Sequence, residues 1–288
     1  MALALAEAAN GVIVNADSAQ LYADLPILSA APSAADRRRA EHRLYAVADG
    51  AFAMSAAAWA DLARAEIAAI HASGRLPILV GGTGLYLRTL IDGIAPVPPI
   101  DPAIRHNVRH ATVADNRERL GLLDPEAAAR LGPSDTTRIA RALEVILSTG
   151  RPLSHWQQHR HGGIGAAITL RPLILLPPRD WLYARCDARF AAMIEGGAIE
   201  EVKALLERDL SPSLPVMRAI GVNEIAAYLA GACTLPEAIA AGQQATRNYA
   251  KRQFTWFAHQ SPAYWPRWRE PLGEGNLRSA LETLGATA

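Results

Sequence analysis

The spacing of apolar and polar residues predicts alternating strands and helices in the first third of the chain. Uninterrupted apolar runs, which are typical of buried parallel strands, cover 12–14 and 76–80. Residues at helical spacing predict helices over 2–9, 55–73 and 85–91. Ser55 can cap the second of these helices, and Gly74 suits its C-terminal end. The alternation indicates a parallel sheet covered on both faces by helices.

The rest of the chain is predicted to be mainly helical. A proline-rich break begins at Pro96, and polar helices follow over 103–113, 116–123, 125–131 and 136–148, the last capped by Asp135. After a glycine-rich hinge near Gly162, one more buried strand is predicted over 173–176, then helices over 181–195, 198–208, 222–230 and 236–259. We therefore expect an α/β core, 1–99 and 165–288, interrupted by a small all-helical insertion, 100–164.

The composition excludes some classes of protein but does not indicate a function. The chain has 288 residues, 50% hydrophobic and 20% charged, an ordinary globular composition. Cys186 and Cys233 are far apart and are expected to be free thiols in a reducing compartment. Because no apolar run approaches the ~20 residues that span a bilayer, we expect no membrane association, and the apolar start is interpreted as a helix rather than a signal peptide. A net charge of +1 neither favours nor excludes binding of nucleic acid, so that question depends on local clusters of basic residues.

Two predicted strands end in residues that can carry chemistry. NADSAQLY follows the first strand and GGTGLYL the second, and ligands of open parallel sheets bind outside the carboxyl ends of the strands. Asp17 can accept a proton or orient a cation, and Thr83 places a hydroxyl at a helix start among glycines that permit close approach. The structural alternatives are a turn or helix cap for Asp17 and a simple tight turn for GGTG.

A third cluster, ATRNYAKRQFTWF, combines basic and aromatic residues on one predicted helix. Arg247 and Lys251 lie four residues apart among aromatic residues, a combination that suits RNA. Its alternative is a surface helix whose aromatic residues belong to the core. TTRIARALEV offers a similar face through Arg138 and Arg141. His155 and His159 have helical spacing for a metal, but no third ligand lies nearby in sequence, and 37–39 is interpreted as a solvated helix face.

These motifs occur together in one known family. NADSAQLY, EHRLYAVAD, GGTGLYLRTLIDG, DPAIR, RALEV and AKRQFTWF, in this order, resemble the tRNA dimethylallyltransferases, and the resemblance runs from about residue 3 to residue 260. It implies a P-loop kinase-like fold and a cytoplasmic, monomeric enzyme. It also implies transfer of a dimethylallyl group from dimethylallyl diphosphate, with Mg²⁺, to N6 of the adenosine 3′ of the anticodon in tRNAs that read U-initial codons.

The resemblance also implies roles for individual residues. Asp17 would take the proton from N6, Thr83 would hydrogen-bond near the reacting centre, and Arg105 would help to neutralise the leaving diphosphate. The family's tRNA-contacting segments fall on four stretches of this chain: Asp17, Ser18, Ala19 and Gln20; Thr137, Arg138, Ile139, Ala140 and Arg141; Arg218, Ala219, Ile220, Gly221, Val222 and Asn223; and Lys251, Arg252, Gln253, Phe254, Thr255, Trp256, Phe257 and Ala258.

The sequence departs from the family pattern at the phosphate loop. It contains no GxxxxGK[ST], and MALALAEAAN matches the helix that follows the loop in the family. We expect that the chain starts about one strand and one loop late, by a misassigned start rather than a degenerate gene. Each lost loop donor costs ~3 kcal/mol of transition-state stabilisation, so activity is expected to be impaired. A missing central strand would leave two unpaired parallel edges and poor solubility.

Smaller departures affect single tRNA contacts. A family lysine is absent from ILSAAP, and Val222, Asn223 and Ala258 replace residues that are often aromatic or basic. Two other functions stay open: a non-catalytic tRNA-binding remnant, and an isopentenyltransferase that acts on free adenine nucleotides. The RALEV helix and the C-terminal basic–aromatic segment favour tRNA over free nucleotides.

Overall fold

The computed structural model describes residues 1–285, which divide into two compact units. The first unit comprises Met1–Leu90 and the chain from Ala167 onwards, and the second comprises Ile91–Ala166. The expected insertion limits, 100 and 164, both fall inside the second unit. A division into core and insertion at those limits stays a prediction.

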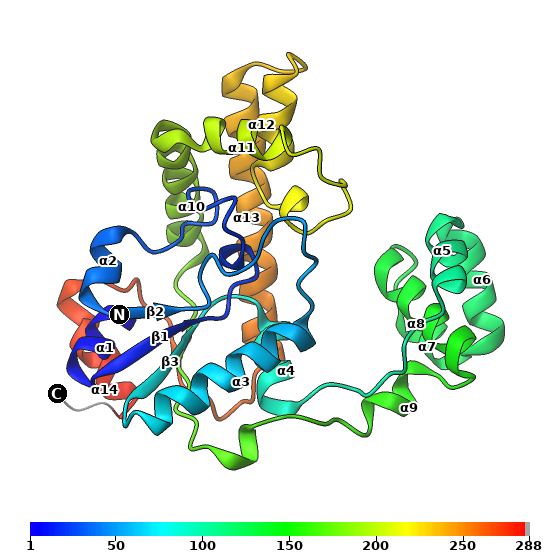
Figure 1. The fold of residues 1–288 in the computed structure, drawn as a ribbon, viewed down its shortest axis with the longest axis horizontal. Coiled ribbons are helices and arrows are strands. Elements are labelled where there is room, and N and C mark those ends of the chain that lie inside the picture. The colour runs from blue at the N-terminus through cyan, green and yellow to red at the C-terminus, as the bar shows by residue number, and fades with distance from the viewer. Residues whose placement is uncertain (286–288) are drawn as a thin grey trace. The chain divides into compact units, whose positions relative to one another are not determined.

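A parallel sheet forms the centre of the first unit (Figure 1). Its strands are β1 (Gly11–Asn15), β2 (Glu41–Arg43) and β3 (Leu76–Val80), in the order β2-β1-β3. All five residues of β1 are buried. Ile13 packs in a cluster with Ala6 of the first helix, while Val12 and Val14 point to the opposite face and are buried too. The prediction of a strand covered on both faces is therefore confirmed for β1.

The outer strand β3 is more exposed. Only Ile78 of β3 is buried, and Leu76 and Val80 are 43% and 36% exposed. Among the described residues, β3 pairs with β1 alone. Pro77, which has no N–H to donate, fits such an edge strand. β3 is therefore less buried than β1, although both α1 and α3 pack against it, as expected for a sheet covered by helices.

A separate two-stranded parallel sheet is formed by β4 (Ile174–Leu175) and β5 (Arg267–Trp268). The expected buried strand over 173–176 is thus shorter, and Leu175 is 46% exposed. Within residues 1–285, β3 and β4 each have a strand on one side only. The parallel strands of the first unit consequently lie in two sheets rather than in one.

Nine α-helices of the described chain belong wholly or mainly to the first unit. They are α1 (Ala2–Ala8), α2 (Ala34–Arg39), α3 (Ala56–Ala72), α4 (Gly84–Asp92), α10 (Arg179–Met193), α11 (Ile199–Leu206), α12 (Val222–Leu229), α13 (Leu235–Gln260) and α14 (Leu277–Thr283). The cap expected for α3 is confirmed, because Ser55 Oγ accepts from the Ala58 N–H at 3.0 Å. Gly74 follows α3 with a φ of +69°, as a helix C-terminus requires.

The long helix α13 packs along α10 (Figure 1). A close approach between them depends on Gly242, where a Cβ atom would lie 2.1 Å from Phe190 Cζ. Because α13 runs for 26 residues, one end of it can pack on α10 while other residues reach the carboxyl ends of the strands. α13 thereby supplies side chains to the candidate site described below.

The second unit contains α5 (Pro102–His110), α6 (Val113–Leu123), α7 (Pro125–Arg130), α8 (Thr136–Thr149) and α9 (Leu153–Gln157). Its core is apolar and comes from α5 to α8: Val108, Leu120, Ala127, Ile139, Ala142 and Leu143. The break between the first two helices lies earlier than expected. Thr112 Oγ1 accepts from the Asp115 N–H at 3.1 Å, so the second helix starts at Val113 rather than at Asn116.

The expected side-chain cap of α8 is wrong. Asp135 occupies the N-cap position but makes no capping hydrogen bond with its side chain. Its Oδ2 instead accepts from the Gly132 N–H at 3.2 Å, because the preceding turn folds back on the carboxylate. Both cysteines are free thiols, as expected, with Cys186 buried. Among the described residues, no helix is long and apolar enough to cross a membrane.

Candidate functional site

The carboxyl end of β1 is fixed by a buried asparagine. Asn15 Nδ2 donates to the carbonyl of Leu44 at 2.9 Å, and Asn15 Oδ1 accepts from the Asp17 N–H at 2.7 Å. The Ala19 N–H then donates to Asp17 Oδ1 at 2.9 Å. The turn that carries Asp17 is therefore held by its own polar groups, and the carboxylate has a defined direction. Asn15 was visible in the sequence as a polar residue at a strand end, but no role was assigned to it.

The second strand end meets the first. The Ala16 N–H donates to the carbonyl of Val80 at 2.8 Å, and the Thr83 N–H donates to the carbonyl of Ala16 at 3.2 Å. Thr83 Oγ1 accepts from the Ser18 N–H at 3.0 Å and lies 3.2 Å from Ser18 Oγ. The two strand ends that the sequence singled out thus share one edge of the sheet, as expected, and their chemical role stays a prediction.

Helix α13 closes this region from a third side. A Cβ on Gly82 would lie 1.9 Å from Gln253 Nε2, and a Cβ on Gly84 would lie 2.4 Å from the Trp256 ring. Gly84 is therefore needed for the loop to lie against the Trp256 ring, whereas the flexible end of Gln253 could move away from a side chain at position 82. Of the basic–aromatic segment, the structure brings Gln253 and Trp256 to the loop that carries Thr83.

Burial sets the electrostatics of the Asp17 carboxyl. Burial raises the pKa of Asp17, and the hydrogen bond from Ala19 and the positive charge of Arg189 offset part of that rise. Arg189 lies on α10, and no feature of the sequence had singled it out. A carboxylate whose pKa is raised is a stronger base than one in water, which suits proton abstraction.

A tyrosine of α13 joins the two strand ends. Burial and the charge of Asp17 raise the pKa of Tyr249, while its hydrogen bonds to Thr83 and Gln253 act in the opposite direction. Burial, with a smaller contribution from Asp17, raises the pKa of Tyr45 to about 12. Both phenols therefore stay protonated. The sequence placed Tyr249 in the basic–aromatic cluster without giving it this position.

Some expected tRNA contacts have polar atoms that are already used within the fold. Gln20 Nε2 donates to the carbonyls of Ser29 and Ala30, at 3.0 and 2.8 Å, so its amide hydrogens hold a neighbouring loop. Gly221 begins α12 with a φ of +97°, and its N–H donates to Glu224 Oε2 at 2.9 Å. These residues shape the surface of the first unit, and their contact with RNA stays a prediction.

The remaining expected residues differ in exposure: Ile139 and Val222 are buried in the core, so their side chains serve packing, whereas several basic residues are exposed. Lys251, Arg252 and Arg218 are exposed in the first unit. Arg105 lies on α5, and 137–141 lies on α8, both in the second unit. The Arg252 guanidinium lies over the Tyr249 ring, 5.5 Å from its centroid. The role of Arg105 at a leaving diphosphate stays a prediction.

The residues beside Asp17 could supply only some of the ligands that a metal ion needs. Among the described residues, no group of three or more His, Cys, Asp or Glu side chains could hold a metal ion. Asp17, Ser18 and Thr83 nevertheless offer hard oxygen donors of the type that Mg²⁺ prefers. Since Mg²⁺ commonly takes one or two carboxylates and completes its shell with substrate phosphates and water, these donors fit an ion that arrives with a diphosphate.

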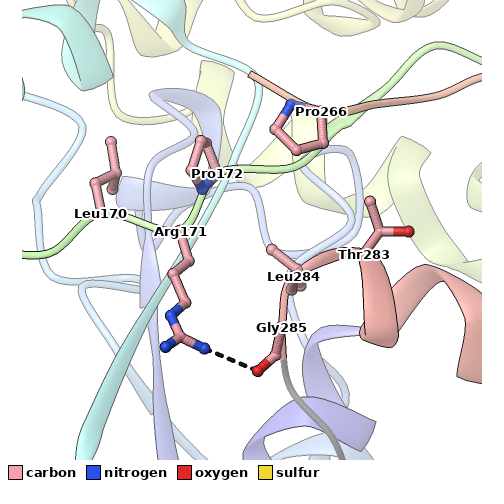
Figure 2. Close-up of a pocket in the computed structure, with 7 residues that line it drawn as sticks. All are labelled: Leu170, Arg171, Pro172, Pro266, Thr283, Leu284 and Gly285. Carbon is pink, nitrogen blue, oxygen red and sulfur yellow. Dashed lines mark hydrogen bonds between the residues drawn. The ribbon is translucent and has the colours of Figure 1, made fainter. Parts of the chain in front are cut away.

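A separate hollow of about 470 Å³ lies elsewhere in the first unit (Figure 2). It is at the amino ends of β4 and β5 and is lined by Leu170, Arg171, Pro172, Pro266, Thr283, Leu284 and Gly285. The Arg171 guanidinium donates to the carbonyl of Gly285 at 2.8 Å and so links two of its walls. Because ligands of parallel sheets bind at carboxyl ends, we do not interpret this hollow as the active site.

Fold and site together define an α/β protein with a half-buried carboxylate, Asp17, at the carboxyl edge of its parallel strands. A family model described as IPP transferase matches residues 20–260. The chain therefore belongs to the IPP transferase family, a family of tRNA-modifying prenyltransferases.

Known proteins of this family are similar to the chain over most of its length. A tRNA dimethylallyltransferase of Sphingopyxis alaskensis is 62% identical, over 94% of this chain and 89% of that protein. The solved tRNA isopentenylpyrophosphate transferase of Bacillus halodurans is 32% identical with a TM-score of 0.68, covering 98% of this chain and 89% of its own. A solved eukaryotic dimethylallyltransferase, described as acting on tRNA, is 27% identical with a TM-score of 0.75. The match covers 89% of this chain and 65% of that one. The predicted fold class is confirmed by these structures.

Proposed function

We propose that the chain transfers a dimethylallyl group from dimethylallyl diphosphate to N6 of the adenosine 3′ of the anticodon, in tRNAs that read U-initial codons. Three kinds of support converge: the names of close relatives, the buried base, and the basic–aromatic helix against the GGTG loop. The single observation that carries the proposal is the position of Asp17, fixed by Asn15 and Ala19 beside Thr83.

The chemistry is one substitution at carbon. The N6 nitrogen forms a bond to the allylic carbon as the bond between that carbon and the diphosphate oxygen breaks. The N6 proton passes to the Asp17 carboxylate, and diphosphate leaves with the electrons of the broken bond. Because the adenine must leave its stack to reach a base at the end of a strand, the substrate is an unpaired loop adenosine.

The other residues position the reactants. Thr83, held by the Ser18 N–H, offers a hydroxyl at the strand end that carries the carboxylate. Arg105 would neutralise charge on the leaving diphosphate, and bound Mg²⁺ would share that charge. The four tRNA-contacting segments would hold the anticodon arm. We further propose that the enzyme acts as a monomer in the cytoplasm, where free thiols such as Cys186 persist.

The proposal predicts a product and a substrate preference. The purified chain, given dimethylallyl diphosphate, Mg²⁺ and unmodified tRNA, should form N6-dimethylallyladenosine, measured by mass spectrometry of digested nucleosides. We expect a low rate, because the sequence has no GxxxxGK[ST] loop to bind the diphosphate. AMP at equal concentration should give no prenylated product, because it lacks the anticodon arm that the basic segments bind. A tRNA whose target adenosine is replaced by guanosine is the matched control. Prenylation of AMP in preference to tRNA would overturn the proposal.

The hydroxyl of Thr83 should matter more than its methyl group. Thr83→Val removes the acceptor of the Ser18 N–H and leaves that donor unpaired beside the base. We expect kcat to fall about 10- to 100-fold, as for a small displacement of a reacting group. Thr83→Ser keeps the hydroxyl and should stay near the unaltered rate in the same steady-state assay. Equal rates for the serine and valine variants would exclude a role for the hydroxyl.

A further inference from the structure

Four arginines gather on two neighbouring helices of the second unit. Arg105 and Arg109 lie one turn apart on α5, and Arg138 and Arg141 lie one turn apart on α8. The side chains of Arg109, Arg138 and Arg141 are 59%, 75% and 39% exposed. Burial lowers the pKa of Arg141; the charge of Glu144 opposes this, and those of Arg105 and Arg109 add to it. Arg141 is thus close enough to Arg105 and Arg109 to be affected by their charges.

A buried carboxylate lies beneath this cluster. Glu144 of α8 is fully buried, between Leu143 and Val145, which are buried as well. Its Oε1 accepts from Arg109 Nε at 2.8 Å, and its Oε2 lies 3.8 Å from Arg141 Nη1. Within the described chain, Oε2 has no hydrogen-bond partner. One carboxylate therefore ties together arginines from two helices.

Stability alone does not account for this arrangement. Taking a carboxylate out of water costs several kcal/mol, which a partner that is 59% exposed repays only in part. An apolar residue would fill the same space in the core of the helical unit at no such cost. The geometry instead fixes Arg109 through its Nε and leaves its terminal N–H groups in solvent, where they can bind an anion.

We propose that Glu144 is a positioning residue for tRNA: it holds Arg109 and Arg141 side by side as a preorganised pair for backbone phosphates. Arg109 is thereby added to the expected RNA contacts of the second unit, which the sequence had limited to 137–141, since Arg105 was expected at the leaving diphosphate. A side chain fixed before binding loses less conformational entropy when it contacts phosphate. Four arginines against Glu144 and Asp135 leave this face positive. The inference rests on the proposed function, because tRNA is the RNA concerned.

The test measures binding of an unmodified anticodon stem-loop to the full chain by fluorescence anisotropy at several salt concentrations. Glu144→Gln removes a negative charge, so simple electrostatics predicts tighter RNA binding. A positioning role predicts the opposite, a loss of about tenfold, because both arginines become free to move. Arg109→Ala should also cost about tenfold and should lower the slope of log affinity against log salt by about one.

Two controls separate positioning from a general loss of structure. Arg119→Ala removes an exposed arginine of α6, outside the cluster, and should change affinity less than Arg109→Ala does. In the Arg109→Ala background, Glu144→Gln should have a smaller effect than alone, because one partner is already gone. Arg109→Ala changes an exposed side chain, so it still tests the inference if Glu144→Gln does not fold.

The outcomes distinguish this inference from the proposed function. If the unaltered chain prenylates tRNA while Glu144→Gln binds it as tightly or more tightly, or Arg109→Ala binds normally, only the inference is overturned. If the unaltered chain neither binds nor prenylates tRNA, both fail. Weaker binding by Glu144→Gln and Arg109→Ala, without additivity, supports the positioning role.

Discussion

Asp17→Asn should lower kcat for tRNA prenylation by about 10²- to 10⁴-fold, the usual contribution of a general base. Asparagine keeps the shape of the side chain and can still accept from the Ala19 N–H, but it cannot take the N6 proton. KM for tRNA should change much less, since the substitution leaves the basic faces intact. Single-turnover kinetics with excess enzyme would measure the chemical step directly.

The pH dependence gives an independent check on the same residue. Burial raises the pKa of Asp17, so the rate should fall as the pH drops through that raised value, because the protonated carboxyl is no longer a base. The Asp17→Asn variant should lose this limb of the profile. Asp61→Asn, at an exposed carboxylate of α3, is the matched control and should keep both rate and profile. Full activity of Asp17→Asn would exclude Asp17 as the base.

The same pKa shift has a consequence for stability. A carboxyl whose pKa is raised in the folded state binds its proton more tightly there than in the unfolded chain. Its contribution to stability is greatest below the ordinary carboxyl pKa and is lost as the pH rises through the raised value. At neutral pH the ionised carboxylate is held away from water, which costs stability. Asp17→Asn removes that charge, so the Tm of the variant at neutral pH should equal or exceed that of the unaltered chain. A slow variant that is not less stable would show that the loss of rate is chemical.

The main elements could be predicted because their sequence signals are local. β1 and β3 are short apolar runs, and α3 carries its cap and stop residues in sequence. β2 could not be predicted, because Glu41–Arg43 is polar and becomes a strand only by pairing with β1. β5 has two residues, too few for any periodic pattern. Such elements depend on partners far away in the chain, which a single sequence does not reveal.

The candidate site also contains residues that could be predicted from the sequence and residues that could not. Asp17 and Thr83 could be predicted because each follows a strand, and strand ends meet at one edge. Glu144 could not, because a glutamate in a polar helical region is ordinarily solvated, and only the tertiary structure buries it beneath Arg109. Arg189 likewise reaches Asp17 only through the packing of α10. Residues that act through long-range contacts therefore required the structure.

Gly81→Ala should have the second large effect, on both stability and catalysis. A Cβ at this position would lie 2.1 Å from the Ala16 carbonyl carbon and 2.6 Å from the Asp17 nitrogen. These are backbone atoms, so no side-chain rotation can relieve the clash. The strand ends must separate, which also breaks the hydrogen bond between the Thr83 N–H and the carbonyl of Ala16. We expect a loss of about 1–3 kcal/mol in the free energy of unfolding, as for other overpacked sites.

Catalysis should fall more than stability alone explains, because the clash moves the base itself. A displacement of about 1 Å can cost about 10²-fold in rate, and Asp17 and Thr83 would move relative to each other. Gly196→Ala is the matched control: its Cβ would meet nothing within 4 Å, and its φ is not positive. That variant should unfold within about 0.5 kcal/mol of the unaltered chain and keep its rate. Chemical denaturation would measure the stability of Gly81→Ala, and single-turnover prenylation would measure its rate. If both were unchanged, the two strand ends would not be in contact in solution.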